Sequence, residues 1–392
     1  MSAPEPIDAI IVGGGPAGSA AAAVLATCGR RVVLLEKGSF PRPKVCGEFL
    51  SASARGSLER IGVLGEVEAD AERIVRGSVN LPAGRAVAFR LPASGLGLSR
   101  FALDDRLARR AGELGAETRF GARVVSVNAK PGRAMRIRYV RESSEADLEA
   151  RGVIGAWGRW DALDRALGRG FERGPRYFGW SRDFTGDTAA LAGEVRLYLF
   201  PGGYCGLSRV EGGAVNLAGV ISESARARLG PGWEAVIAHT RRSNVALDRD
   251  LAPLSEGPVG VLGTGPVFFI AKPPVEDGML IVGDAAGVID PFSGEGQAAA
   301  LASGILAAEV LERGLSGAIA MEAVPGAYVA AWKDRFGRRF TWSAAFRRLM
   351  LHPRLGTIMA PLVGERLIRL ALSRLGASPG GETARDPSLR SG

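Results

Sequence analysis

Two glycine-rich segments near opposite ends of this 392-residue chain carry the residue types best suited to bind a phosphate-bearing ligand. The first reads IVGGGPAGS and spaces Gly13, Gly15 and Gly18 as G-x-G-x-x-G. That spacing lets backbone N–H groups approach a pyrophosphate, because no side chain stands in the way. The second, GDAAGVIDPFSGEG, adds the carboxylate of Asp284. In this order and at this separation, the two segments indicate FAD, with the second at its flavin end, and hence redox chemistry.

The elements around the first segment are those that a dinucleotide-binding turn needs. Residues 7–12 are apolar, as expected of a parallel strand buried on both faces, and residues 19–27 are rich in alanine, a strong helix former. A second apolar strand over residues 31–35 ends in Glu36. A carboxylate there suits a ribose hydroxyl and repels a 2′-phosphate. The context predicts a Rossmann-like unit with the pyrophosphate at the helix N-terminus.

Composition limits the other chemistry that the chain can perform. Hydrophobic residues make up 46% and charged residues 23%, which is ordinary for a globular protein. The chain has three cysteines, too few for a disulfide framework, and two histidines, which argues against a histidine-based metal site or a Ser-His-Asp triad. No secretory leader is evident ahead of the first strand. We therefore expect a cytoplasmic protein with no metal.

The formal net charge is +9, and ten of the 50 Lys and Arg residues lie between Trp332 and Arg374, interleaved with bulky apolar residues. Two interpretations stay open. The stretch suits a helix on a membrane surface, which would make the protein peripheral to a membrane, and it equally suits a helix that packs on the core with a solvated basic face. Nucleic acid is not expected as a partner, because no nucleic-acid-binding module accompanies the charge.

The order of the elements predicts an α/β fold: a discontinuous Rossmann-like FAD-binding domain, an inserted antiparallel-sheet substrate domain and a helical C-terminal region. Three β-like runs over residues 195–200, 204–210 and 214–221, joined by glycine-rich turns, mark the inserted sheet. The predicted FAD-binding domain comprises residues 1–75, 97–158 and 265–315. The substrate domain comprises residues 76–96 and 159–264. Residues 316–376 are expected to be helical, and residues 377–392 to form a disordered tail.

Three segments of the chain resemble the geranylgeranyl reductase family of flavoproteins, within the p-hydroxybenzoate hydroxylase-like superfamily. Residues 41–47 match its PRxKxCG loop, residues 100–104 its R-x-x-[LF]-D segment, and residues 283–296 its GDAAG-x-x-x-P-x-x-GEG segment. The resemblance implies that Arg100 contacts FAD and that Asp284 bonds its ribityl chain. The residues expected to bind FAD are Gly13, Gly15, Pro16, Ala17, Gly18, Glu36, Lys37, Arg42, Lys44, Cys46, Gly47, Arg100, Val125, Gly283, Asp284, Pro291, Gly294, Glu295 and Gly296.

The chain departs from related flavoproteins at two places. Hydroxylating relatives carry an Asp-Gly pair in a GADG-type segment, whereas residues 155–158 read GAWG, so Trp157 replaces the acid. Halogenating relatives carry W-x-W-x-x-P and a catalytic lysine, but residues 197–201 contain no tryptophan. The latter segment is similar to the Y-x-W-x-F-P pattern of geranylgeranyl reductases, and we expect Tyr198, Phe200 and Pro201 to line the substrate pocket.

Cys46 is the predicted catalytic residue, because the resemblance puts its loop beside the flavin. The nearby cations Arg42 and Lys44 would lower the pKa of its thiol. The alternative is that Cys46 is a small residue that packs a tight loop. The proton donor would then be water or an acid such as Glu48 or Glu295.

The leading functional hypothesis is an enzyme that uses reduced FAD to saturate a carbon–carbon double bond of a hydrophobic small molecule, an isoprenoid or a polyketide-like compound. Cys46, Gly47 and Trp157 favour it. The hydroxylase-like overall plan favours the alternative, a flavin monooxygenase acting on a lipophilic or aromatic substrate. A third class, a flavoprotein that passes electrons to a partner, has no motif of its own. The electron donor stays open between NAD(P)H and a redox partner, because no second GxGxxG marks a nicotinamide domain.

Overall fold

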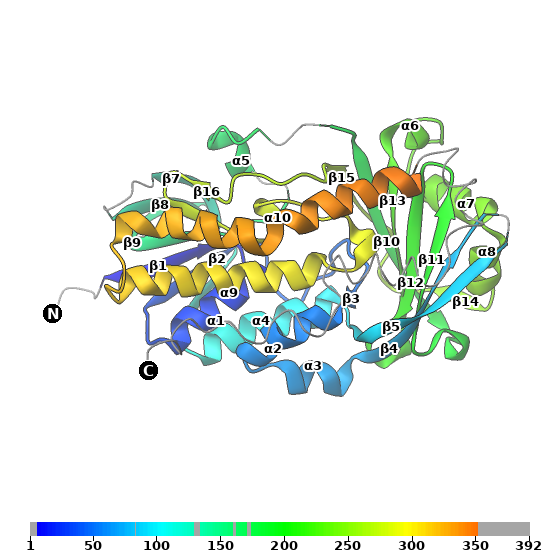
Figure 1. Cartoon of the computed structure of the whole chain (residues 1–392), viewed down its shortest axis with the longest axis horizontal. Coiled ribbons are helices and arrows are strands. Elements are labelled where there is room, and N and C mark those ends of the chain that lie inside the picture. The colour runs from blue at the N-terminus through cyan, green and yellow to red at the C-terminus, as the bar shows by residue number, and fades with distance from the viewer. Residues whose placement is uncertain (1–5, 83, 129–133, 160–161, 171–173, 352–392) are drawn as a thin grey trace, which may run out of the picture.

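Two β-sheets at opposite ends of an elongated molecule form the framework of the protein (Figure 1). The computed structural model describes residues 6–82, 84–128, 134–159, 162–170 and 174–351, and of residues 341–351 only the backbone. Four helices cover the first sheet, namely α1 (Pro16–Thr27), α4 (Arg100–Glu113), α9 (Gly296–Leu315) and α10 (Val324–Leu351) (Figure 1). Helices α7 (Trp233–Ser243) and α8 (Val245–Leu251) lie on the far side of the second sheet (Figure 1). The predicted α/β fold is confirmed.

The first sheet has a parallel centre in the strand order β16-β17-β9-β1-β2-β6. All residues of β2 and nearly all of β1 are buried, as their apolar sequences predict. Two further strands, β7 and β8, form an antiparallel extension on the first half of β9. The bounds are β1 Ile7–Val12, β2 Val32–Glu36, β6 Glu117–Phe120, β7 Arg123–Asn128, β8 Met135–Arg141, β9 Ser144–Gly155, β16 Val275–Glu276 and β17 Met279–Ile281.

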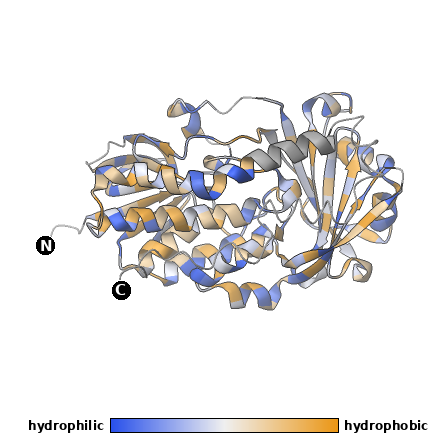
Figure 2. Cartoon of the chain, viewed as in Figure 1, coloured by the Kyte–Doolittle hydropathy of each residue, from blue (hydrophilic) through white to orange (hydrophobic). Residues whose placement is uncertain are grey.

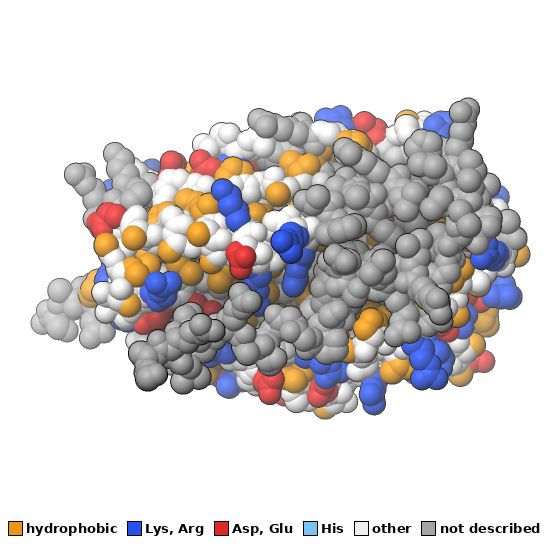
Figure 3. Space-filling model, in the orientation of Figure 1, with side chains coloured by type: hydrophobic (Ala, Val, Ile, Leu, Met, Phe, Trp, Pro, Cys, Tyr) orange, Lys and Arg blue, Asp and Glu red, His pale blue; other side chains and the backbone are white. Residues whose placement is uncertain are grey.

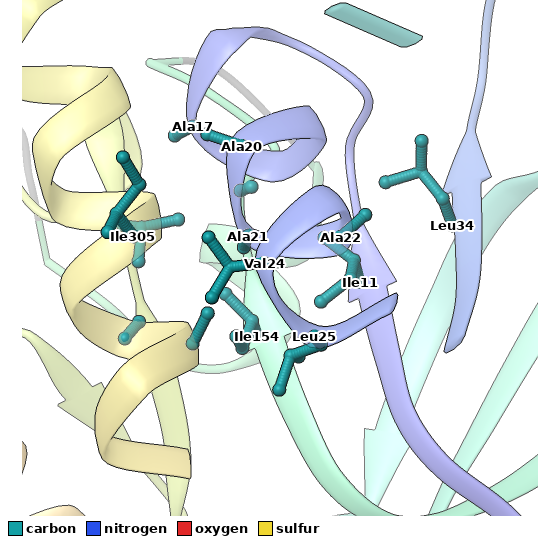
Figure 4. Packing of buried hydrophobic residues seen from close by; sticks show 14 of the residues in the cluster. Ile11, Ala17, Ala20, Ala21, Ala22, Val24, Leu25, Leu34, Ile154 and Ile305 are labelled. Carbon is teal, nitrogen blue, oxygen red and sulfur yellow. The ribbon is translucent and has the colours of Figure 1, made fainter. Parts of the chain in front are cut away.

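Helix α1 (Pro16–Thr27) packs tightly between the first sheet and α9 (Gly296–Leu315). Its alanines are all buried, and Ile305 of α9 lies beside them while Ile154 of β9 lies beneath (Figure 4). At Gly304 a Cβ would lie 2.0 Å from the carbonyl oxygen of Ala17. Small residues on both helices therefore allow their backbones to meet. The result holds the first turn of α1 rigidly over the carboxyl end of the sheet.

The second sheet is antiparallel, apart from the parallel pair β4 and β11, in the order β14-β10-β13-β12-β11-β4-β5-β3, with β15 on β10. The three predicted runs correspond to β11, β12 and β13 to within two residues at each end. The bounds are β3 Phe49–Leu50, β4 Glu72–Asn80, β5 Ala86–Gly97, β10 Tyr177–Gly186, β11 Glu194–Phe200, β12 Gly203–Arg209, β13 Val215–Ser222, β14 Leu254–Glu256 and β15 Leu262–Val267.

The two faces of the second sheet are both apolar but have different partners. One face packs on α7 and α8. The other contacts Phe269, Val288 and Phe292, which come from the segments that flank β17. This inner face is thus directed at the first sheet's domain. The remaining helices are α2 Arg55–Arg60, α3 Leu64–Asp70, α4 Arg100–Glu113, α5 Ala162–Ala166, α6 Glu223–Arg226, α7 Trp233–Ser243, α8 Val245–Leu251 and α10 Val324–Leu351.

The described part of α10 resolves one question about the basic C-terminal stretch. Trp332 and Phe336 are buried in the core, while Lys333 and Arg338 are exposed. Hydrophobic and hydrophilic residues alternate along α9 and α10 (Figure 2), as expected of helices that bury one face. Residues 332–340, the part of the stretch whose side chains are described, are thus core cover. Residues 352–392, which include the expected tail, lie outside the described residues. Within the described residues, no helix is both long and apolar enough to cross a bilayer.

Candidate functional site

A cavity of about 570 Å³ opens where the carboxyl ends of β1, β2, β9 and β17 face the second sheet. Ligands of open parallel sheets bind at such ends. The cavity brings together both glycine-rich segments, the loop after β2, the start of α4 and the start of β15. Of the residues expected to bind FAD it is lined by Gly13, Gly15, Pro16, Ala17, Glu36, Lys37, Arg42, Lys44, Cys46, Gly47, Arg100, Gly283, Asp284, Pro291, Gly294 and Gly296.

The turn between β1 and α1 shows why each of its glycines is required. Gly13 has φ +106°, and a Cβ there would lie 2.4 Å from the carbonyl oxygen of Ala156. A Cβ at Gly18 would lie 1.8 Å from the carbonyl oxygen of Gly13. At Gly15, by contrast, a Cβ would approach only an Arg100 nitrogen, at 4.0 Å. Gly13 and Gly18 therefore permit the backbone path, whereas Gly15 leaves space open on the cavity side.

Glu36 ends β2 with a buried carboxylate that already has three donors. Its Oε2 accepts a hydrogen bond of 2.7 Å from the Gly14 N–H. Its Oε1 accepts from the Gly38 N–H and from Nη2 of Arg42, both at 2.9 Å. These contacts fix the carboxylate over the glycine turn. They also show that Arg42 is an ion-pair partner of Glu36.

Asp104 joins the loop after β2 to helix α4. The carboxylate is fully buried and accepts two hydrogen bonds of 2.7 Å from Arg100 and one of 2.6 Å from Lys44. Burial alone would raise the pKa of Asp104, but the two cations have the larger effect and lower it below its usual value. The carboxyl therefore stays ionised. Lys44 is therefore held at α4.

Cys46 lies in the cavity wall with a polar neighbour on each side. Its Sγ accepts hydrogen bonds of 3.4 Å from Nε2 of Gln297 and from the Glu48 N–H, and its carbonyl oxygen accepts from Asn216 at 2.8 Å. Burial raises the pKa of the thiol, and the opposing effect of Arg100 is smaller. The expected lowering of the pKa by Arg42 and Lys44 is wrong, because those cations pair with Glu36 and Asp104.

The second glycine-rich segment also lines the cavity. Asp284 is partly exposed there, with an Oδ2 3.7 Å from Nε of Arg159. Gly294 has φ +68°, and a Cβ on it would meet the ring of Phe49 at 2.5 Å. This contact joins the segment to the Cys46 loop.

Three of the expected FAD-binding residues do not line the cavity. Gly18 lies under the turn. Glu295 is buried, accepts a hydrogen bond of 2.7 Å from Ser53 and lies 3.7 Å from Arg339. Val125 lies at an irregularity in the pairing of β7 with β8, and its neighbour Val124 lines the cavity in its place.

The expected pocket wall on β11 lies on the wrong face of the strand. Tyr198 is fully buried and its hydroxyl donates to Asp250 at 2.6 Å, in the cluster beneath α7 and α8. Phe200 packs edge-on against His239, and Pro201 follows on that side. Their neighbours Leu197 and Leu199 belong instead to the inner face. Alternate side chains of a strand face opposite sides of the sheet. The motif therefore predicted residues one position away from those that face the inner side.

The cavity also has lining residues that the motifs did not assign. Trp157, which replaces the acid of hydroxylating relatives, is one, and Phe269 and Val288 extend the apolar inner face into the cavity. Glu48, two residues after Cys46, is another. Glu48 follows the Cys-Gly pair directly, and of the two acids expected as alternatives to Cys46, Glu48 and Glu295, it is the one that lines the cavity. Phe269 and Val288 gave no signal in the sequence, because tertiary packing alone brings them there.

Comparisons with known proteins agree with this geometry. Residues 6–182 match the sequence profile of an FAD binding domain. The chain is 29% identical over 386 residues to menaquinone reductase of Mycobacterium tuberculosis, a match that covers 92% of this chain and 88% of that one. It is 30% identical over 350 residues to digeranylgeranylglycerophospholipid reductase 1 of Methanopyrus kandleri, which covers 85% and 86% of the two chains.

Solved structures of similar fold include a geranylgeranyl bacteriochlorophyll reductase-like protein from Thermoplasma acidophilum. It has a TM-score of 0.73 and 21% identity, and the match covers 95% of this chain and 92% of that one. A myxobacterial chondrochloren halogenase has a TM-score of 0.80 and 23% identity, covering 95% and 91%. At these identities the two structures establish a shared fold.

Proposed function

This chain belongs to the geranylgeranyl reductase family of FAD-dependent oxidoreductases, and from that premise we propose that it saturates a carbon–carbon double bond in the prenyl chain of a lipid. The observation that carries the proposal is the likeness, over most of the chain, to reductases named for menaquinone and for a digeranylgeranyl glycerophospholipid. Both are lipids that join a polar head to a polyprenyl tail. The shared chemistry is therefore an isolated double bond in a hydrocarbon chain.

The residues of the cavity fit FAD. The turn at Gly15 is open on the side where a pyrophosphate needs close approach, and the adjacent start of α1 offers free backbone N–H groups. The Glu36 carboxylate is fixed beside the turn for a ribose hydroxyl. We propose that Asp284 and Arg100, which both line the cavity, hold the remainder of the cofactor. FAD, once reduced, supplies the hydride equivalent that a double-bond reduction needs.

The substrate wall is proposed on the inner face of the second sheet. Phe269 and Val288 line the cavity and continue into an apolar cluster with Tyr177, Leu199 and Tyr204. A hydrocarbon chain gains about 0.8 kcal/mol for each CH₂ that it buries on such a surface. These features favour an extended prenyl chain over a small polar molecule.

Anaerobic single turnover tests the proposal. FAD-loaded protein is reduced with dithionite, freed of excess reductant and mixed with a menaquinone that carries a polyprenyl tail, or with digeranylgeranylglyceryl phosphate. We expect the flavin to reoxidise and the product to gain two hydrogen atoms in its tail by mass spectrometry. The control is the fully saturated analogue of digeranylgeranylglyceryl phosphate, which has neither a double bond nor a quinone to accept electrons and should leave the flavin reduced. Insertion of one oxygen atom in an aerobic arm, with no anaerobic product, would instead favour hydroxylation.

A further inference from the structure

Glu48 occupies a backbone conformation that its side chain does not favour. Its φ is +55°, in the left-handed region where glycine and asparagine are common. Of the other non-glycine residues with positive φ in the described parts of the chain, Glu142, Ser143 and Asp277 all lie in tight turns between paired strands. Glu48 instead lies in the cavity wall. Strain of this kind persists where the structure holds a side chain in place for a purpose.

The contacts of Glu48 hold one carboxylate oxygen and leave the other available. Its backbone carbonyl accepts a hydrogen bond of 3.0 Å from the Leu98 N–H, and its Oε1 accepts one of 2.9 Å from the Arg100 N–H at the start of α4. Within the described part of the chain Oε2 has no hydrogen-bond partner, yet it is not sealed from solvent. The second oxygen is therefore free to meet a molecule in the cavity.

The charges around Glu48 favour its neutral form. Burial raises its pKa to about 7, and the carboxylates of Glu211 and Asp183, from the second sheet's domain, add to the rise. The Arg100 N–H and guanidinium act in the opposite direction. That guanidinium is already committed to Asp104 through two hydrogen bonds. A carboxyl that exchanges its proton near neutral pH is well matched to general acid catalysis.

A purely structural role for Glu48 is already filled by other residues. The N-cap of α4 is Ser99, whose hydroxyl accepts from the Ala102 N–H at 3.1 Å. Ser99 is in turn fixed by Glu211, which accepts from its N–H at 2.8 Å and from its hydroxyl. A glutamine at position 48 would still accept from the Arg100 N–H. The carboxyl proton is therefore what distinguishes glutamate from glutamine there.

We infer that Glu48 is the general acid of the proposed reduction. The inference rests on the proposed function and names the source of its proton. In the balanced step the O–H bond of the Glu48 carboxyl breaks and a C–H bond forms at one carbon of the substrate double bond. The other carbon receives the hydride that the reduced cofactor supplies. The Glu48 carboxylate then recovers its proton from water. The Cys46 thiol, with its raised pKa, remains neutral beside it.

The test compares Glu48→Gln with Glu142→Gln, a matched control at an exposed left-handed position remote from the cavity. The probe is digeranylgeranylglyceryl phosphate, which has no quinone that could reoxidise the flavin by itself, in anaerobic single turnover of the dithionite-reduced holoenzyme. We expect Glu48→Gln to bind FAD and be reduced normally but to reoxidise about 10²–10⁴-fold more slowly. The wild-type rate should fall above about pH 7, because the Glu48 carboxyl is then deprotonated. Glu48→Asp should recover part of the rate that Glu48→Gln loses.

A second readout does not depend on turnover. Infrared difference titration of the oxidised holoenzyme should show a glutamate carboxyl that loses its proton near pH 7 in wild type and in Glu142→Gln, but not in Glu48→Gln. Absence of that titration in wild type, or reoxidation of Glu48→Gln at the wild-type rate, overturns the role of Glu48 while the proposed function stands. Wild-type enzyme that reduces neither the menaquinone nor digeranylgeranylglyceryl phosphate overturns the proposed function, and the inference with it.

Discussion

The pKa of a side chain in this cavity depends on whether the neighbouring cations already form ion pairs with other residues. Arg42 and Lys44 lie close to Cys46 in the sequence, and this spacing predicted that their charges would lower the pKa of its thiol. Their charges, however, are taken by Glu36 and Asp104. Sequence order cannot reveal such pairing, because Asp104 is 60 residues away from Lys44. The prediction of FAD contacts needed only residue types, whereas the prediction of a reactive thiolate needed this pairing.

Cys46→Ala tests whether the thiol acts as an acid. Because burial raises its pKa and Glu48 is available beside it, we expect the variant to bind FAD and to reoxidise within about tenfold of the wild-type rate in anaerobic single turnover. Cys46→Ser serves as the isosteric control. A loss of about 10²-fold or more in both variants, with FAD content intact, would return the acid role to Cys46.

The raised pKa of Glu48 also predicts how stability depends on pH. Between about pH 4.5 and 7 the folded protein retains a proton that the unfolded chain has released. The free energy of unfolding therefore falls as pH rises through this window, by about 1–3 kcal/mol in total. Glu48→Gln should abolish this part of the slope and leave the protein relatively more stable at pH 8. Thermal melts of the wild type, Glu48→Gln and Glu142→Gln at several pH values provide the measurement. Identical slopes in all three would contradict the expectation.

At the scale of elements, the parts that sequence predicted well are those whose geometry is local. The β1–α1 turn has a strand, a glycine pattern and a helix in continuous sequence, and the structure adds only the close contacts of Gly13 and Gly18. Three strands of the second sheet were predicted from the sequence, but the face of the sheet that is directed at the cavity was not predicted correctly. Tyr198 and Leu199 differ by one position, and the partner of each face was decided by α7 and α8 on one side and Phe269 on the other.

The turn between β1 and α1 offers a matched pair of substitutions. Gly15→Val should fold with near-normal stability, because the space beside Gly15 is open in the protein, yet it should lose FAD binding, because the side chain fills the place of the pyrophosphate. Gly18→Ala should instead destabilise the fold itself, because its Cβ would overlap the Gly13 carbonyl. Thermal melts without FAD, together with fluorescence titration of FAD, separate the two effects. A Gly15→Val variant that retains FAD would contradict the proposed location of the pyrophosphate.

At the scale of the whole molecule, the site exists only where the two sheets meet. Asn216 of β13 holds the carbonyl of Cys46, and Glu211 holds the start of α4, so the second sheet's domain positions both the loop and the helix of the first. The return of β17 to the first sheet, after the strands of the second, could be predicted from the two glycine-rich segments and the run of strands between them. The contacts across the junction could not, because each joins residues that are more than 100 positions apart.

The surface of the molecule bears on which partners it can use. On the face shown in Figure 3 the Lys and Arg side chains of the described residues are scattered among acidic and hydrophobic ones. Residues 332–340, the part of the basic C-terminal stretch whose side chains are described, turn Trp332 and Phe336 inward. Neither feature provides the apolar face on which a membrane-surface helix depends. Membrane contact thus stays a prediction for the part of the stretch beyond the described residues.

The source of electrons yields the last prediction. One cavity serves the proposed cofactor and substrate, and the sequence contains no second G-x-G-x-x-G turn for a nicotinamide. Trp157 stands where hydroxylating relatives carry an acid, and its ring is buried against Gly155 with the Arg169 guanidinium above it. We therefore expect NADPH and NADH to reduce the bound flavin much more slowly than the enzyme turns over, and a redox partner to be needed. Stopped-flow absorbance under anaerobic conditions measures this, with dithionite as the control for a reducible flavin. The prediction is contradicted if NADPH alone reduces the flavin as fast as the prenyl substrate reoxidises it in single turnover. The nicotinamide would then reach the flavin directly, and Trp157 would not block its access.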